Sequence, residues 1–248
     1  MARQLLTLIA SVVYILSTPV QGGQPELCSL SAKNLPQCLI TAIQNVIPIL
    51  VKGIPRYGVY PMDPMHIDTL DLSNSPGKTL NVKHKFTNVD LQGLSSAVIR
   101  HVRLNPKTVE IDVNAILSKP VVLTGNYVSQ GKILTLPIRG GGKFNITLIN
   151  MRAVLKMRGH QTTKNGKVHV MMDSVKFPFK IDKMELLFEN LLRGNRLLSD
   201  TLNSVLNENW ESVLEDMKPS FEEAIGSAFK EFANRIFNRI PLSDLLQD

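Results

Sequence analysis

The 248-residue chain has two cysteines, one tryptophan and none of the short motifs that mark common enzymes. It has no G-x-S-x-G elbow, no H-E-x-x-H zinc motif and no G-x-x-x-x-G-K-[ST] phosphate loop. The segment 140–143 comes nearest to a phosphate loop, but Phe144 stands where a hydroxyl residue belongs, so we expect a hairpin turn there. The sequence therefore argues against an enzyme, although a hydrolase with an unrecognised site stays open.

The five histidines are dispersed, and no two of them have the spacing of a helix-borne metal site. We therefore expect no metal and no other cofactor. His84 falls on the apolar face of an expected strand. Two interpretations remain for it, a core histidine hydrogen-bonded to the backbone or a polar contact for a ligand headgroup.

The N-terminus predicts a secretory signal peptide over residues 1–22 and a mature chain over 23–248. Arg3 precedes an apolar stretch at 5–16, and Val20 and Gly22 are small residues suited to cleavage. A membrane anchor is the alternative, but a spanning helix needs roughly 20 apolar residues. Charged residues interrupt the later apolar segments, so we expect a soluble, secreted chain without a second run of membrane length.

Cys28 and Cys38 both follow the expected cleavage site closely. Exported chains meet an oxidising compartment, so we expect these two residues to form a disulfide. The short loop that it closes implies about 2 to 3 kcal/mol of stabilisation in the chain-entropy model. Metal binding is the weaker alternative, because no further ligands have suitable spacing.

The chain carries 28 Lys and Arg against 21 Asp and Glu, a net charge of +7. These basic residues are scattered and form no stripe with interleaved aromatics, so we expect no nucleic-acid partner. Solvated surfaces explain the charge, while a weak attraction to anionic membranes stays open.

Hydrophobic periodicity divides the mature chain into a helix, a long strand region and a helical C-terminus. Apolar residues at helical spacing predict a helix over 39–51, and alternation of period two predicts antiparallel strands from 66 to 181 that share one apolar face. Turn residues at 74–77, 105–106, 125–126, 140–142 and 165–166 suggest a meander of hairpins.

Two amphipathic helices are expected after residue 184. One carries an apolar stripe that ends before Pro219, and the second begins at that proline, which suits a first turn. A one-faced sheet followed by two helices predicts a single α+β domain in which the sheet wraps a helix.

Asn145 begins the one N-x-[ST] sequon of the chain. Alternation places it opposite the apolar Phe144 and Ile146, so it should face solvent and be available for glycosylation. An unmodified polar strand residue is the alternative.

Several motifs together resemble the takeout and juvenile-hormone-binding family of insects. They are the early cysteine pair, Gly53-Ile54-Pro55 with Pro61-Met62-Asp63-Pro64, Phe188-Glu189-Asn190-Leu191-Leu192 with Gly194-Asn195, Leu206-Asn207-Glu208-Asn209-Trp210, and Pro219. The resemblance implies a highly curved antiparallel β-sheet wrapped around a long C-terminal α-helix, enclosing an elongated apolar tunnel. Hormone carriers of the family typically have a second disulfide, and this chain has no cysteine after Cys38, so it looks closer to the takeout branch.

The same resemblance implies a function. We expect an extracellular carrier, in haemolymph or another fluid, of a small hydrophobic ligand such as juvenile hormone, another terpenoid or a fatty acid. Circadian, feeding or chemosensory roles, and a receptor for the loaded form, would fit such a carrier. A monomer is the default. The alternative function is a basic, membrane-active lipid-transfer or host-defence protein.

We expect eight apolar residues to contribute to the wall of the tunnel, by contact rather than by chemistry. Ordinary core packing is the alternative for each of them. The eight are Val113, Val175, Phe177, Phe179, Phe221, Ile225, Phe229 and Phe232.

Overall fold

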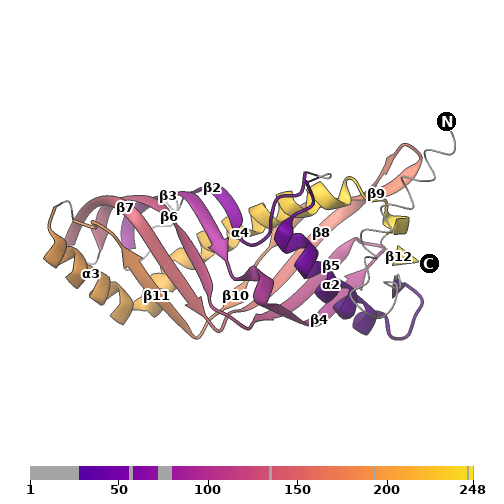
Figure 1. Cartoon of the computed structure of the whole chain (residues 1–248), viewed down its shortest axis with the longest axis horizontal. Coiled ribbons are helices and arrows are strands. Elements are labelled where there is room, and N and C mark those ends of the chain that lie inside the picture. The colour runs from indigo at the N-terminus through magenta and orange to yellow at the C-terminus, as the bar shows by residue number, and fades with distance from the viewer. Residues whose placement is uncertain are drawn as a thin grey trace.

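The structure is a computed structural model that describes residues 28–55, 58–71, 80–133, 136–192, 194–244 and 246–247. The expected signal peptide and the expected turn at 74–77 lie outside these ranges. The helices are α2 (Leu35–Lys52), α3 (Arg196–Glu208) and α4 (Trp210–Phe237), with short 3₁₀ turns η2 (Leu94–Ser96) and η3 (Leu242–Asp244) (Figure 1). The strands are β1 (Cys28–Ser29), β2 (Met65–Asp71), β3 (Leu80–Gln92), β4 (Ala97–Asn105), β5 (Glu110–Leu117), β6 (Val121–Ile133), β7 (Leu136–Ile149), β8 (Arg152–Lys164), β9 (Lys167–Lys176), β10 (Phe179–Lys180), β11 (Lys183–Phe188) and β12 (Leu246–Gln247).

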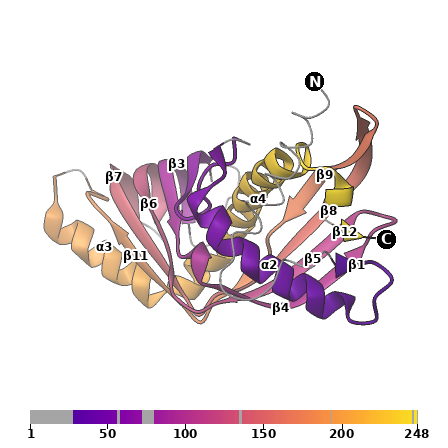
Figure 2. The ribbon, with the colours of Figure 1, turned by 45° about the vertical axis from the view of Figure 1, so that its right-hand side comes forward.

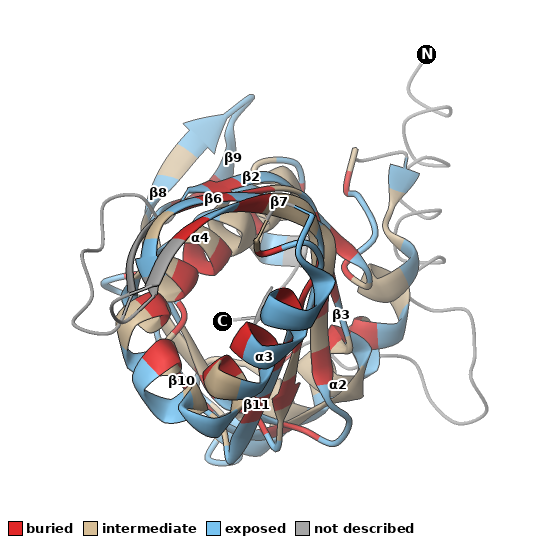
Figure 3. Ribbon diagram, turned by 90° about the vertical axis from the view of Figure 1, so that its left-hand side faces the viewer, coloured by how far each residue is buried: buried red, intermediate tan, exposed pale blue. Residues whose placement is uncertain are grey.

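Curved antiparallel sheets wrap the long helix α4, as expected from the sequence. One sheet has the order β11-β7-β6-β3-β2, and the other has the order β10-β8-β5-β4 with β9 paired to β8. Seen along the long axis, the strands bend around the interior, and the buried residues of α3 and α4 face inward (Figure 3). The expectation of one hairpin meander is wrong, because β3 pairs with β6 and β5 pairs with β8.

The glycines at two expected turns lie inside long strands instead. Gly140 is part of β7, and a Cβ on it would lie 2.4 Å from the carbonyl oxygen of Leu191. Gly125 is part of β6, and a Cβ on it would lie 2.6 Å from the carbonyl oxygen of Asn88, beside a register shift in β3. At both positions the absence of a side chain lets another backbone segment pass close to the strand. These glycines therefore mark close backbone contacts within the sheets and not the expected turns. The expected turn at 165–166 does connect β8 to β9.

The break between the C-terminal helices lies at Asn209 and not at Pro219. Asn209 ends α3 with a side-chain hydrogen bond to the carbonyl oxygen of Val205, at 2.8 Å, and its own carbonyl accepts from the N–H of Val213 at 3.1 Å. Pro219 lies inside the continuous helix α4. One proline removes one N–H donor, and the packing of α4 on the sheets maintains the helix through that position.

Helix α2 lies beside β4, as two views of the molecule show (Figures 1 and 2). The side chain of Gln44 accepts from the N–H of Ile99 at 2.9 Å and donates to the carbonyl of Ala97 at 3.0 Å. By length and composition alone, α2 could cross a membrane, so the expectation of no second apolar run of that length is wrong. The run carries no charge before Lys52 at its end.

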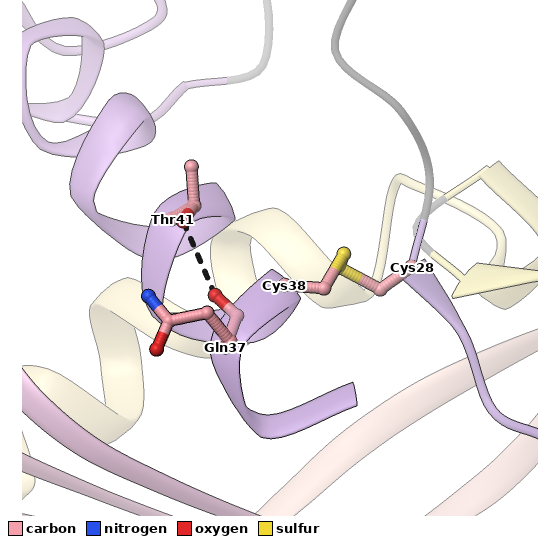
Figure 4. The surroundings of a disulfide bond; sticks show 4 residues. All are labelled: Cys28, Gln37, Cys38 and Thr41. Atoms are coloured by element: carbon pink, nitrogen blue, oxygen red, sulfur yellow. Dashed lines mark hydrogen bonds between the residues drawn. A yellow bond between two sulfur atoms is a disulfide. The ribbon is translucent and has the colours of Figure 1, made fainter. Parts of the chain in front are cut away.

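The disulfide between Cys28 and Cys38 is present and confirms the expected pairing (Figure 4). It joins β1 to the first turns of α2. Strand β1 also pairs in parallel with β12, near the other end of the chain. The bond therefore ties the N-terminal strand, and through it β12, to α2.

The alternation of apolar and polar residues over 109–113 predicts that Val109 and Val113 face the core and that Asp112 faces water, and the structure confirms this in part. Val109 is buried, but it lies before β5 with a positive φ of 50°. Asp112, expected to face water, instead lies between Arg103 and Arg158, with its carboxylate oxygens 2.6 Å and 2.7 Å from their guanidinium nitrogens. The hydrogen bond from Arg158 is the main reason that the pKa of Asp112 is lowered, although burial opposes it.

Candidate ligand-binding interior

Helix α4 lines the interior because it packs against β9, β11 and β2, and so reaches both sheets. Its apolar residues recur on one face at helical spacing. Gly226 allows close contact with β9, since a Cβ on it would lie 2.5 Å from the carbonyl oxygen of Val175. This close approach places the neighbouring apolar residues of α4 against the end of β9.

An aromatic cluster forms where α4 meets the connection between β9 and β10. The rings of Phe177 and Phe229 stack with their centroids 5.2 Å apart, and Phe179 lies 6.3 Å from Phe177. Glu222 of α4 accepts a hydrogen bond from the N–H of Phe179 at 3.2 Å, and Lys218 lies 5.5 Å above its ring. Three of the expected wall residues are therefore in one cluster at the helix–sheet junction.

The remaining expected wall residues belong to the same apolar core. Val113, on β5, is buried, as are Phe221 and Ile225 on α4. Val175 and Phe232 are half-buried, like Phe229 in the aromatic cluster. These three side chains keep part of their apolar surface uncovered, and whether they line a tunnel stays a prediction.

A second aromatic cluster lies inside the other sheet and was not expected from the sequence. Phe86 and Phe144 meet edge to face at 4.7 Å, and Tyr127 meets Phe188 at 5.0 Å. The hydroxyl of Tyr127 donates to the carbonyl of Glu189 at 2.6 Å, and burial raises the pKa of this tyrosine. His84 stacks on the same rings. Period-two alternation placed His84 and Phe144 on apolar strand faces but did not reveal that these rings meet in one cluster.

His84 is a buried core histidine whose polar partner is a side chain. Its Nδ1 lies 2.5 Å from Oγ of Ser129 on β6, whereas one interpretation expected a hydrogen bond to the backbone. Burial lowers its pKa to about 4, so the ring is neutral at neutral pH. The cluster therefore presents apolar rings with one neutral imidazole among them.

Two open hollows occur on the outer surface, near β7, β11 and α3. One has a volume of about 580 Å³ and is lined in part by Asn145, Leu187 and Asn207; the other, of about 460 Å³, is lined in part by Thr124 and Asn145. None of the eight expected wall residues lines either hollow. The exposed position of Asn145 matches the expectation from strand alternation.

The curved sheets, the long wrapped helix and the apolar interior define an α+β protein of the wrapped-helix class. Residues 6–247 match the model of the family described as haemolymph juvenile hormone binding protein. The chain belongs to this family, as its motifs indicated. The family consists of carriers of hydrophobic ligands and is not a family of enzymes.

Individual relatives agree with this assignment. The circadian clock-controlled protein daywake of Drosophila melanogaster is 24% identical over 217 residues, covering 85% of this chain and 83% of the relative. A putative beta-carotene-binding protein of Schistocerca gregaria is 22% identical over 206 residues, covering 82% and 81%. The crystal structure of Takeout 1 from Epiphyas postvittana matches with a TM-score of 0.79 at 28% identity, covering 90% of this chain and all of that chain.

Proposed function

We propose that this protein is a secreted carrier that holds one small hydrophobic ligand in the interior between α4 and the two sheets. The observation that carries the proposal is the apolar interior along α4. There the buried ring of Phe177 stacks on the ring of Phe229, which is only half-buried. A hydrocarbon that displaced water from such surface would gain free energy in proportion to the area buried. The protein would act by binding and would turn nothing over.

The energy of binding can be bounded. Burying about a dozen methylene groups releases roughly 10 kcal/mol before costs, at about 0.8 kcal/mol each. Association costs about 4 to 15 kcal/mol. The gain from burial lies within the range of the association cost. Micromolar or tighter binding therefore requires an interior that is already shaped for the ligand, which keeps the cost low.

The relatives favour terpenoids and similar lipids as the ligand class. The family description names juvenile hormone, and the Schistocerca gregaria relative is named for beta-carotene, which is also a terpenoid. Fatty acids are similar to these terpenoids in size and hydrophobicity and belong to the proposed ligands. The name of the daywake relatives supports a circadian role, which abundance of the protein across a light–dark cycle would test.

The experiment that tests the carrier function is native mass spectrometry of the protein secreted from insect cells. We expect a discrete adduct that organic extraction removes and that gas chromatography identifies as a terpenoid or fatty acyl compound. Recovery of an added lipid ester unchanged would exclude turnover. An empty protein that also takes up no terpenoid or fatty acid would contradict the proposal.

Variants on α4 test where the ligand lies. Phe229→Ala should weaken binding of the extracted ligand about tenfold, because it removes a stacked ring from the proposed wall. Phe237→Ala is the matched control, since Phe237 is a half-buried phenylalanine of the same helix outside the expected wall. Equal losses in both variants would argue against this position of the ligand.

A membrane-active lipid-transfer or host-defence role is the second candidate, and two observations favour it. The net charge is +7, and the apolar helix α2 is mostly half-exposed. Such a protein would bind vesicles of anionic lipid, and binding would fall steeply as salt rises. Salt-dependent vesicle binding without an extractable ligand would favour this role over the carrier.

A further inference from the structure

His84 presents a buried ring nitrogen without a partner. The residue lies on β3 opposite Ser129 of β6, and the two are 6% and 1% exposed. Nδ1 of the histidine is paired with Oγ of Ser129, whereas Nε2 has no hydrogen-bond partner among the residues that the structure describes. Buried polar atoms are nearly always hydrogen-bonded, so Nε2 is a polar atom that the described part of the chain leaves unsatisfied.

The hydrogen bonds around the ring assign its proton. The neutral imidazole has one N–H, and the hydroxyl of Ser129 can donate one hydrogen bond. In the described part of the chain, Nδ1 of His84 is the one acceptor within reach of that hydroxyl. The opposite roles would leave both the Ser129 O–H and Nε2 without partners, so the arrangement with fewer unpaired buried groups has Ser129 donating to Nδ1 and the ring proton on Nε2. The unpaired atom is a hydrogen-bond donor.

The surroundings of this donor are apolar and aromatic. The ring of His84 stacks on Phe86 with centroids 5.9 Å apart and on Phe188 at 6.5 Å. Phe86 and Phe188 are themselves buried in the core. The described residues also contain no group of three His, Cys, Asp or Glu that could hold a metal ion. An acceptor oxygen carried by a lipophilic molecule would suit these apolar surroundings.

We propose that Nε2–H of His84 donates a hydrogen bond to a neutral acceptor oxygen of the bound ligand, such as an ester, ketone or ether oxygen. This inference rests on the proposed carrier function and narrows its substrate class. A free carboxylate is disfavoured, because burying it requires a positive charge that the neutral ring does not supply. An alcohol is disfavoured because its own O–H would need a second buried acceptor.

Three matched probes, each bound to the delipidated full-length protein, test this ligand class. They are methyl hexadecanoate, hexadecanoic acid, and nonadecane, which has as many non-hydrogen atoms as the ester. Each displaces a fluorescent hydrophobic probe in competition. We expect the ester to bind about tenfold more tightly than nonadecane, as one buried hydrogen bond implies, and more tightly than the acid.

His84→Phe removes both nitrogens and keeps an aromatic ring. In this variant the ester should lose about tenfold in affinity, while nonadecane stays within about twofold, which also shows that the interior is intact. The matched control is His169→Phe, since His169 of β9 is equally buried and its Nδ1 is also unpaired among the described atoms. It should keep the preference for the ester.

The outcomes separate the two proposals. If wild type binds none of the probes, the carrier function fails, and this inference with it. If nonadecane and the ester bind equally, or if His84→Phe keeps the preference for the ester, only the role of His84 is overturned. An equal loss in His169→Phe would also overturn it.

A measurement without substitution covers the case in which His84→Phe does not fold. Nitrogen-15 NMR of the histidine rings in the full chain should show the proton of His84 on Nε2. Methyl hexadecanoate should shift that signal and nonadecane should not. An unchanged Nε2 signal with the ester bound, or a proton on Nδ1, would overturn the proposal.

Discussion

Asn234 of α4 and Met172 of β9 exchange two hydrogen bonds. The side-chain oxygen of Asn234 accepts from the N–H of Met172 at 2.7 Å, and its amide nitrogen donates to the carbonyl of Met172 at 3.0 Å. Strand β9 pairs on one side with β8, so the amide satisfies backbone groups at its other edge. A single side chain thus replaces a neighbouring strand and fixes the position of α4 along the sheet.

The same arrangement recurs at the edge of the other sheet. Asn203 of α3 forms two such bonds with the backbone of Phe188, both at 2.9 Å, and Asn207 forms two with Leu186 at 2.8 and 2.7 Å. Gln44 of α2 bonds in a similar way to the backbone of β4, so amide side chains from helices cover three edge strands, β4, β9 and β11. The two bonds of Asn207 give this residue of the Leu206–Trp210 motif a structural role.

We predict that Asn234→Ala destabilises the protein by about 2 to 3 kcal/mol, because it leaves a buried N–H and carbonyl of β9 without partners. Urea unfolding followed by circular dichroism measures the change. Asn45→Ala is the matched control, since Asn45 is exposed on α2 and should change stability by less than about 0.5 kcal/mol. Equal effects in the two variants would refute the structural role of Asn234.

Removing the disulfide should also lower stability. The double variant Cys28→Ser and Cys38→Ser opens a loop with a sequence separation of 10, and the loop-closure model predicts a loss of about 2 to 3 kcal/mol. Hydrogen exchange should rise first in β1 and at the start of α2, which the bond joins. Unchanged protection there would show that the packing of α2 on β4 suffices without the bond.

The sequence predicted the element types well and the topology poorly. Helical spacing placed α2 and the C-terminal helices, because one face of each is apolar. It could not show that α4 continues through Pro219, since packing on the sheets outweighs the local cost of a proline. Nor could composition distinguish a turn glycine from Gly140, whose role depends on the crossing of a segment that is distant in the chain.

The candidate site shows the same division. Phe221, Ile225 and Phe229 could be predicted as one apolar face because they lie on one helix. The pair of His84 and Ser129 could not, because their contact depends on the register between β3 and β6, which are separated in sequence by two other strands. Alternation alone indicated that His84 faces inward and left its partner open.

We predict that Asn145 carries an N-linked glycan when the protein is secreted from insect cells. Asn145 is exposed on β7, and the hydroxyl of Thr147 lies 3.2 Å from its side-chain oxygen. A shift in electrophoretic mobility that a glycosidase removes should disappear in both Asn145→Gln and Thr147→Val. Asn126→Gln, an exposed asparagine outside any sequon, is the control. Persistence of the shift in Asn145→Gln would place the glycan elsewhere.

His84 should make the protein less stable in mild acid. Its pKa is lowered from 6.5 to about 4 in the folded chain, so between these values the unfolded chain binds a proton that the folded chain does not. The stability is therefore fully present above pH 6.5 and is lost as the pH falls toward 4. Between pH 7 and pH 5 this histidine alone should cost about 2 kcal/mol of the free energy of unfolding.

Urea unfolding at pH 7 and pH 5 checks this effect in wild type and His84→Phe. The ring neighbours Phe86 and Phe188 do not titrate, and burial keeps Tyr127 protonated throughout this range, so none of these three groups masks the signal. The variant should lose about 2 kcal/mol less than wild type over the interval, because a phenylalanine binds no proton in either state. Parallel losses in the two proteins would mean that His84 titrates normally, and hence that the imidazole is hydrated rather than enclosed in the apolar interior.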